Sequence, residues 1–166
     1  MISKQRQAWL ALALCAFAIG PVSGSDGLSG IADRQAITQQ IAEYAYRWDK
    51  KDASAFAELF TQSGTIDWVL GGKPEATSVV GKKNIEAYAK KAYKERLAGK
   101  QSRHHFTNIM FMEISSDRAV TKHMMFVTHH TPGSSPENVA TGYYRTVWTK
   151  TDDEWLIDRR TLYLDR

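Results

Sequence analysis

Residues 101–130, QSRHHFTNIMFMEISSDRAVTKHMMFVTHH, constrain the fold most, because polar and apolar residues alternate through both halves. Alternation is typical of β-strands, and the polar run at 115–118 predicts a hairpin turn between them. Side chains two apart share one face of a strand. The first strand should therefore present a common face made of His104, Phe106, Asn108, Met110 and Met112. Polar groups on such an apolar face need partners when buried, which indicates a lined pocket.

Helical periodicity precedes this hairpin. Apolar residues recur every three to four positions over 33–48, with Asp33 as a candidate N-cap, and again over 83–97. Asp52 is a candidate cap for a short helix between them. Turn residues delimit further strands at 65–70, 139–150 and 155–165. This order favours an α+β domain with helices on one side of a curved, mostly antiparallel sheet.

The N-terminal segment, residues 1–24, is predicted to be a secretory signal. Lys4 and Arg6 precede an apolar run over 8–19, and small residues at 22–24 suit cleavage before Ser25. The run is too short to span a bilayer comfortably, and a retained anchor is the alternative. Cleavage would leave a flexible lead-in at 25–30 and one domain at 31–166. We then expect a periplasmic or extracellular protein.

Cysteine and charge argue against several kinds of site and partner. The single cysteine, Cys15, lies in the predicted signal, so the mature chain would have no disulfide, thiol nucleophile or thiolate metal site. The net charge is +4 and its basic residues are scattered, whereas nucleic-acid binders concentrate them. The basic residues of 82–96 are interpreted as a solvated face, with contact to an anionic surface as the alternative. We expect no nucleic-acid partner and no stable membrane insertion after signal cleavage.

Four side chains could carry chemistry. Asp49 ends the first helix and His104 begins a strand; a carboxylate beside an imidazole fixes its tautomer and makes a general base near neutral pH. Tyr44, near Asp49 on the helix, and Arg160, on the last strand, could donate to a leaving group or to developing negative charge. A histidine satisfied within the core is the alternative interpretation of His104.

A family resemblance rests on five stretches spread over most of 31–165: IAEYAYRWD at 41–49, AELF at 57–60, HHFTN at 104–108, GYY at 142–144 and WLIDRR at 155–160. In these stretches the chain resembles a SnoaL-like member of the nuclear transport factor 2-like (NTF2-like) superfamily. The resemblance implies a cystatin-like cone in which three helices pack on a strongly curved sheet. Within the superfamily the pattern is similar to scytalone dehydratase, bile-acid 7α-dehydratase and hexachlorocyclohexane dehydrochlorinase.

The resemblance also implies roles for particular residues. In those lyases a helix-end Asp and a strand His abstract a proton, and the matching positions here are Asp49 and His104. Tyr44 matches a functional Tyr or Lys, and Arg160 matches the catalytic Arg of the dehydrochlorinase. The residues expected to bind substrate are Asn108, His123, Tyr144 and Trp68. A secretory signal is not typical of these lyases.

The remaining histidines leave alternatives open. His123 and His129 share one face of the second hairpin strand, so either could be a second pocket base, or both could be strand-end residues near solvent. The pairs at 104–105 and 129–130 could suggest a metal site, but no carboxylate spacing supports one. His105, His130 and Asp67 are not assigned.

Two functions are therefore expected. The first is a lyase, dehydratase-like or dehydrohalogenase-like, or an isomerase, that acts without cofactor on a hydrophobic cyclic small molecule. The second is a non-catalytic module of the same fold that binds a small molecule or another protein. The resemblance implies a homo-oligomer, a dimer or a trimer. Fold alone cannot choose between these functions.

Overall fold

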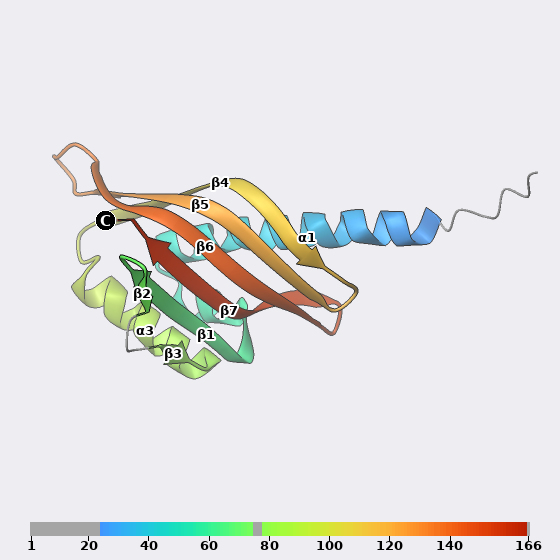
Figure 1. Cartoon of the computed structure of the whole chain (residues 1–166). Coiled ribbons are helices and arrows are strands. Elements are labelled where there is room, and N and C mark those ends of the chain that lie inside the picture. The colour runs from blue at the N-terminus through green and yellow to red at the C-terminus, as the bar shows by residue number, and fades with distance from the viewer. Residues whose placement is uncertain (1–23, 75–77, 166) are drawn as a thin grey trace, which may run out of the picture.

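The computed structural model of the protein describes residues 24–74 and 78–165 (Figure 1). All of the predicted signal except Gly24 lies outside the described residues. The described helices are α1 (Gly24–Asp49), α2 (Ala53–Glu58) and α3 (Lys82–Glu95). The strands are β1 (Phe60–Leu70), β2 (Lys73–Pro74), β3 (Val79–Val80), β4 (Gln101–Ile114), β5 (Arg118–His130), β6 (Glu137–Thr151) and β7 (Glu154–Leu164). No described helix is long and apolar enough to cross a membrane.

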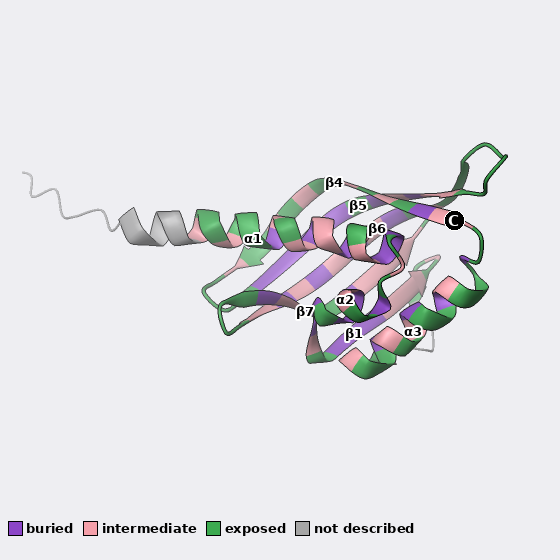
Figure 2. Ribbon diagram, turned by 180° about the vertical axis from the view of Figure 1, so that it is seen from behind, coloured by how far each residue is buried: buried purple, intermediate pink, exposed green. Residues whose placement is uncertain are grey.

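The strands form one sheet in the order β2-β1-β7-β6-β5-β4, and β3 also pairs with β1. All neighbouring strands are antiparallel except β1 and β7, which run parallel. The view from behind shows α1, α2 and α3 over the same face of the sheet (Figure 2). The predicted α+β class, with helices on one face of a mostly antiparallel sheet, is confirmed.

Helix α1 starts earlier than the periodicity predicts. It begins at Gly24, so the helix includes residues 25–30, for which a flexible lead-in was predicted. Asp33, predicted to cap the helix, lies within it, and its carboxylate accepts hydrogen bonds from Trp155 Nε1 (2.9 Å) and Lys150 Nζ (3.0 Å). Asp33 therefore fastens α1 to β6 and β7 instead of starting the helix.

The apolar stripe of α1 forms the centre of the core. Four of its side chains are buried: Ile37, Ile41, Tyr44 and Trp48. Phe56 of α2 packs edge-on against two of these rings, with centroids 4.8 Å from Tyr44 and 5.0 Å from Trp48. Asp52 caps α2 as predicted, since its Oδ1 accepts from the backbone N of Ala55 at 3.0 Å. The stripe thus holds α2 against α1 and turns both toward the sheet.

A β-bulge in β4 changes which side chains face the helices. Asn108 has a φ of +56°, and the register with β5 shifts next to it. Before the bulge, His104 and Phe106 face inward. Beyond it the side chains packed on the core are Ile109, Phe111 and Ile114. Met110 and Met112 are each 56% exposed. The common face predicted for β4 is therefore wrong beyond Phe106, because the extra residue reverses the alternation.

Replacing Asp33 with Ala should lower the free energy of unfolding by about 1–3 kcal/mol, because the buried Trp155 Nε1–H loses its acceptor. The hydrogen bond from Trp155, helped by Lys150, holds the pKa of Asp33 below its ordinary 3.8. A carboxyl whose pKa is lowered by folding stabilises the folded state at pH values above its unfolded-state pKa. This stabilisation is lost as the pH falls. The difference from the parent chain should therefore shrink below about pH 4. Urea unfolding at neutral and acidic pH measures it.

Asp158 offers the matched control, because its side chain makes no hydrogen bond or ion pair with any described residue. Asp158→Ala should change the unfolding free energy by no more than about 0.5 kcal/mol. Equal destabilisation by both substitutions would contradict the anchoring role of Asp33.

Candidate active site

A cavity of about 350 Å³ lies between the sheet and helices α1 and α3. Its apolar and aromatic wall comprises Trp48, Ile66, Trp68, Tyr88, Leu97, Met125, Val127, Val139, Ala140, Leu162 and Leu164. Its polar lining comprises Tyr44, Arg96, His104, His129 and Tyr144. A mostly apolar cavity of this size with a few polar groups is typical of a small-molecule site.

Asp49 and His104 meet at the wall of this cavity. Asp49 Oδ1 lies 2.8 Å from His104 Nδ1, and Asp49 Oδ2 accepts from the His104 backbone N at 2.9 Å. Ser102 Oγ donates to Asp49 Oδ1 at 2.8 Å. An ionised carboxylate only accepts hydrogen bonds, so His104 carries its proton on Nδ1. Its Nε2 is then the atom with a free lone pair, on a ring that lines the cavity.

The first residues of β4 hold this pair in place. Gln101 Nε2 donates to the backbone O of Asp49 at 2.8 Å, which satisfies a carbonyl at the end of α1. Ser102 is fully buried two positions before His104 and faces the same side of the strand. Sequence reasoning missed both residues. The alternation that placed His104 inward also places Ser102 inward, so a buried hydroxyl beside the carboxylate could have been anticipated.

Arg160 lies beneath the cavity, where it does not line the wall. It is fully buried, and its Cζ is 3.7 Å from the Tyr44 ring centroid and 3.8 Å from that of Tyr144. Its Nη1 donates to Thr146 Oγ1 at 3.2 Å and its Nη2 to His123 Nε2 at 3.1 Å. The structure therefore places Arg160 outside the cavity lining, and its predicted catalytic role stays a prediction. The guanidinium stacks between two phenol rings that do line the cavity.

Burial sets the protonation of these stacked groups. Desolvation lowers the pKa of Arg160, although Tyr44 and Tyr144 oppose that shift. Burial raises the pKa of Tyr44 well above its usual 10 and also raises the pKa of Tyr144. Both phenols therefore keep their protons at neutral pH and can donate hydrogen bonds. No carboxylate pairs with Arg160 among residues 24–74 and 78–165.

His123 is a buried neutral residue and does not serve as a pocket base. Desolvation, with Arg160 adding to it, lowers the pKa of His123 to about 2. Its Nε2 accepts from Arg160, its Nδ1 has no partner in the described part of the chain, and its ring centroid lies 4.8 Å from that of Phe106. Phe106, Arg160 and Tyr144 pack around His123, so it does not line the cavity, and its predicted contact with substrate stays a prediction.

The other predicted positions divide into two groups. Trp68 and Tyr144 line the cavity as expected, and His129 lies at its edge. Asn108 is exposed at the bulge and does not line the cavity, and its predicted contact with substrate stays a prediction. The unassigned residues are also outside it. Asp67 pairs with Arg159 at 2.9 Å and accepts from the Ser78 hydroxyl, and both His105 and His130 are exposed. No three His, Cys, Asp or Glu side chains of the described chain gather as a metal site.

The arrangement can perform proton transfer. His104 Nε2 can accept a proton at the cavity wall, and the Asp49 carboxylate stabilises the imidazolium that forms. The phenols of Tyr44 and Tyr144 belong to the same lining and can donate to an oxygen or halide that gains negative charge. Base and donors are therefore present around one apolar space.

Solved structures share this architecture. Rv3472(D26N) of Mycobacterium tuberculosis, of unknown function, superposes with a TM-score of 0.72 at 23% identity, over 90% of this chain and 78% of that one. A candidate scytalone dehydratase of Novosphingobium aromaticivorans gives 0.72 at 18%, over 84% and 89%. An NTF2-like protein with a cystatin-like fold, from the same species, gives 0.73 at 20%, over 89% and 91%. At these identities the likeness shows the fold.

The sequence itself matches a family model. No curated protein matched the chain. The model of the SnoaL-like domain matches residues 29–161, which run from α1 into β7 and include every residue of the cavity described above except Leu162 and Leu164. The match covers well over half of the 166 residues. The protein therefore belongs to the SnoaL-like domain family and has the NTF2-like, cystatin-like fold.

Proposed function

We propose that the protein is a lyase or isomerase that acts without cofactor on a hydrophobic cyclic small molecule. One observation carries this proposal: the Asp49 carboxylate holds Nδ1 of His104 at 2.8 Å on the wall of an apolar cavity. That contact leaves Nε2 of His104 to act as base. A histidine held this way suits general-base catalysis near neutral pH.

The reaction would begin with a C–H bond of the substrate. His104 Nε2 takes the proton, and the electrons of the broken bond form a carbon–carbon double bond. In an elimination, hydroxide or halide leaves the neighbouring carbon with its electron pair; in an isomerisation, the charge moves to a conjugated oxygen. Tyr44 and Tyr144 donate hydrogen bonds to the group that becomes negative. Asp49 keeps the His104 imidazolium oriented until His104 gives up the proton. The proton goes to the leaving group or solvent in an elimination and to a carbon of the intermediate in an isomerisation.

Arg160 supports this chemistry as a positioning residue. Its guanidinium fixes the two phenol rings from below, and its positive charge favours negative charge on atoms that their hydroxyls contact. A candidate scytalone dehydratase has the same fold, and this likeness supports elimination as the reaction type. The competing function is non-catalytic binding of a hydrophobic molecule. The position of Arg160 outside the cavity lining favours that alternative, because the Arg160 guanidinium then does not contact the ligand.

Loss of the dyad should abolish proton transfer. We expect Asp49→Asn and His104→Ala each to slow catalysed exchange or elimination by about 10²–10⁴-fold. The measurement is mass spectrometry of cyclic alcohols, halides and unsaturated ketones incubated with the protein in D₂O. An elimination appears as loss of water or hydrogen halide, and an exchange or isomerisation appears as deuterium gained when the carbon is protonated again.

His105→Ala is the matched control, since this neighbouring histidine is exposed and lies outside the cavity. It should keep the parent rate. Full activity in both dyad variants would refute the catalytic role of Asp49 and His104. Tight binding with neither loss of water or hydrogen halide nor deuterium incorporation in any of these compounds would favour the non-catalytic alternative.

Arg160→Met should lower kcat by about tenfold, equivalent to ~1.4 kcal/mol, while KM changes little, because the guanidinium does not line the cavity. Arg160→Lys retains a cation and should recover part of the rate. Circular dichroism and thermal unfolding check that both variants fold. A rise in KM alone, with kcat unchanged, would contradict the positioning role.

We also propose that the protein is exported and self-associates. The features of residues 1–24 support export. On the other face of the sheet Met110, Met112 and Met124 are each more than half exposed, and exposed apolar patches mark interaction sites. The exported protein should begin at Ser25 by mass spectrometry and behave as a dimer or trimer in light scattering. An intact first residue, or a monomer at every concentration, would contradict the respective proposal.

A further inference from the structure

The cavity has two chemically different ends. Residues such as Tyr44 and Tyr144 are buried and form the inner end. Arg96 and Val139 are exposed yet line the same cavity, so they mark its mouth, together with the half-buried His129. The body of the cavity between these ends is apolar. A ligand that fills the cavity therefore meets phenols at one end and a guanidinium at the other.

The backbone of Arg96 is held at the end of α3, but its side chain has no partner among the described residues. It is the C-cap residue of α3, and its backbone N donates to the carbonyl of Ala92 at 3.0 Å. Its side chain makes no hydrogen bond or ion pair with any described residue. By contrast, Lys82 and Lys90 of the same helix pair with Glu58 and Glu86. The guanidinium at the mouth is thus available to a ligand.

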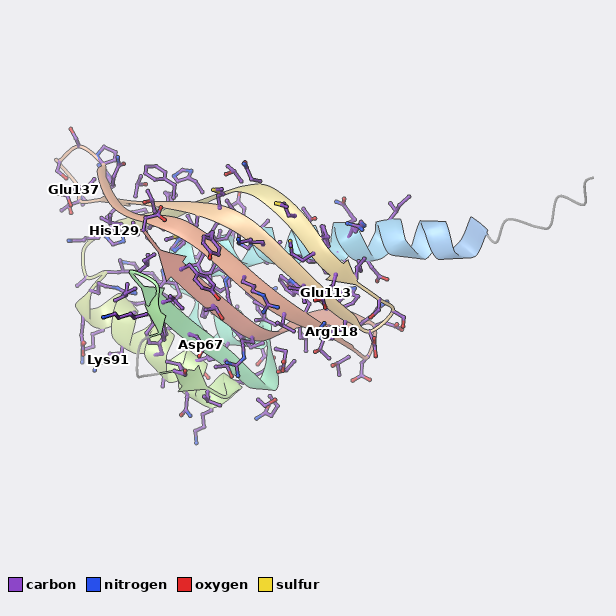
Figure 3. The ribbon with its side chains drawn as sticks, viewed as in Figure 1. Asp67, Lys91, Glu113, Arg118, His129 and Glu137 are labelled. Atoms are coloured by element: carbon purple, nitrogen blue, oxygen red, sulfur yellow. The ribbon has the colours of Figure 1, made fainter. Side chains whose placement is uncertain are left out.

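The mouth is electropositive. Burial, then Lys100 and Arg96, lower the pKa of His129, which shows that both cations act on this edge of the cavity. Glu137 opposes them from β6, where it pairs with His129 across the strands. Figure 3 shows His129 and Glu137 together at this end of the sheet. Two cations therefore face one carboxylate.

We propose that the cavity binds a hydrophobic molecule carrying an anionic group, with Arg96 binding the anion at the mouth and the apolar wall enclosing the ring system. This inference rests on the proposed function only in placing the substrate in this cavity. A guanidinium presents paired N–H donors that match the two oxygens of a carboxylate or sulfonate. The anion also keeps one end of the molecule at the solvent and directs the apolar end toward His104 and the phenols.

Two matched dyes test the proposal. 8-Anilinonaphthalene-1-sulfonate and N-phenyl-1-naphthylamine share an aromatic body, and only the first is an anion. Their affinities are measured by fluorescence titration at low salt. Arg96→Gln should weaken binding of the sulfonate by about fivefold to tenfold, the range for a partly exposed charge-assisted contact. It should leave the affinity for the neutral dye within about twofold, because the apolar wall is unchanged.

Lys91→Gln is the control, because this substitution also removes one positive charge. Lys91 lies on α3 (Figure 3) and does not line the cavity. The substitution should leave both affinities unchanged. Ala140→Trp adds bulk to the cavity wall and should weaken binding of both dyes if they occupy the cavity. Circular dichroism confirms the fold of each variant.

Several outcomes would overturn the inference: equal weakening of the sulfonate by Arg96→Gln and Lys91→Gln, binding of the neutral dye alone, binding of neither dye, or sulfonate binding that Ala140→Trp leaves intact. The dyad variants separate this inference from the proposed function. Asp49→Asn should bind both dyes normally even though it loses turnover. Full turnover in that variant would refute the catalytic proposal and leave the anion site standing.

Discussion

The junction between the end of α1 and the start of β4 is the interaction on which the site depends. One carboxylate, that of Asp49, accepts from the Ser102 hydroxyl and from both the backbone and the ring of His104. Gln101 closes the last turn of the helix onto the same strand. Because these contacts join residues 53 to 55 positions apart, the helix cannot move without moving the histidine. The same contacts that orient the ring also fix the angle between helix and sheet.

A second constraint comes from the buried cation. Arg160 is surrounded by aromatic rings, a threonine and a neutral histidine, with no carboxylate beside it in the described residues. Burial of a cation without a counter-ion is costly, and stacking on aromatic faces offsets part of that cost. Such an arrangement is retained where the charge acts on neighbouring groups. The two phenols above it are those groups, since they separate the guanidinium from the cavity.

The bulge at Asn108 explains why the common face predicted for β4 ends at Phe106. Alternation along β4 holds from Ser102 to Phe106, so His104 could be assigned to the pocket from the sequence. One extra residue then reverses the alternation as far as a second register shift between Phe111 and Glu113, which carries Met110 and Met112 to the outside. The sequence contains no glycine there. Asparagine tolerates a positive φ, but its presence only weakly predicts a bulge. The sequence also could not show that Arg160 and His123 lie buried outside the cavity lining, because strand alternation gives the face of a residue but not its depth.

The sequence alone determined the α+β class, the hairpin, the stripe of α1, the cap at Asp52 and the pairing candidates Asp49 and His104, because these follow from local periodicity and from quoted family stretches. The tertiary structure alone decided that Asp33 is an anchor, that Arg160 lies behind the phenols, and that Arg96 at the mouth has no partner within residues 24–74 and 78–165. These features depend on contacts between segments far apart in the chain. Local propensity carries no information about such distances, since they arise from how helices and sheet pack together.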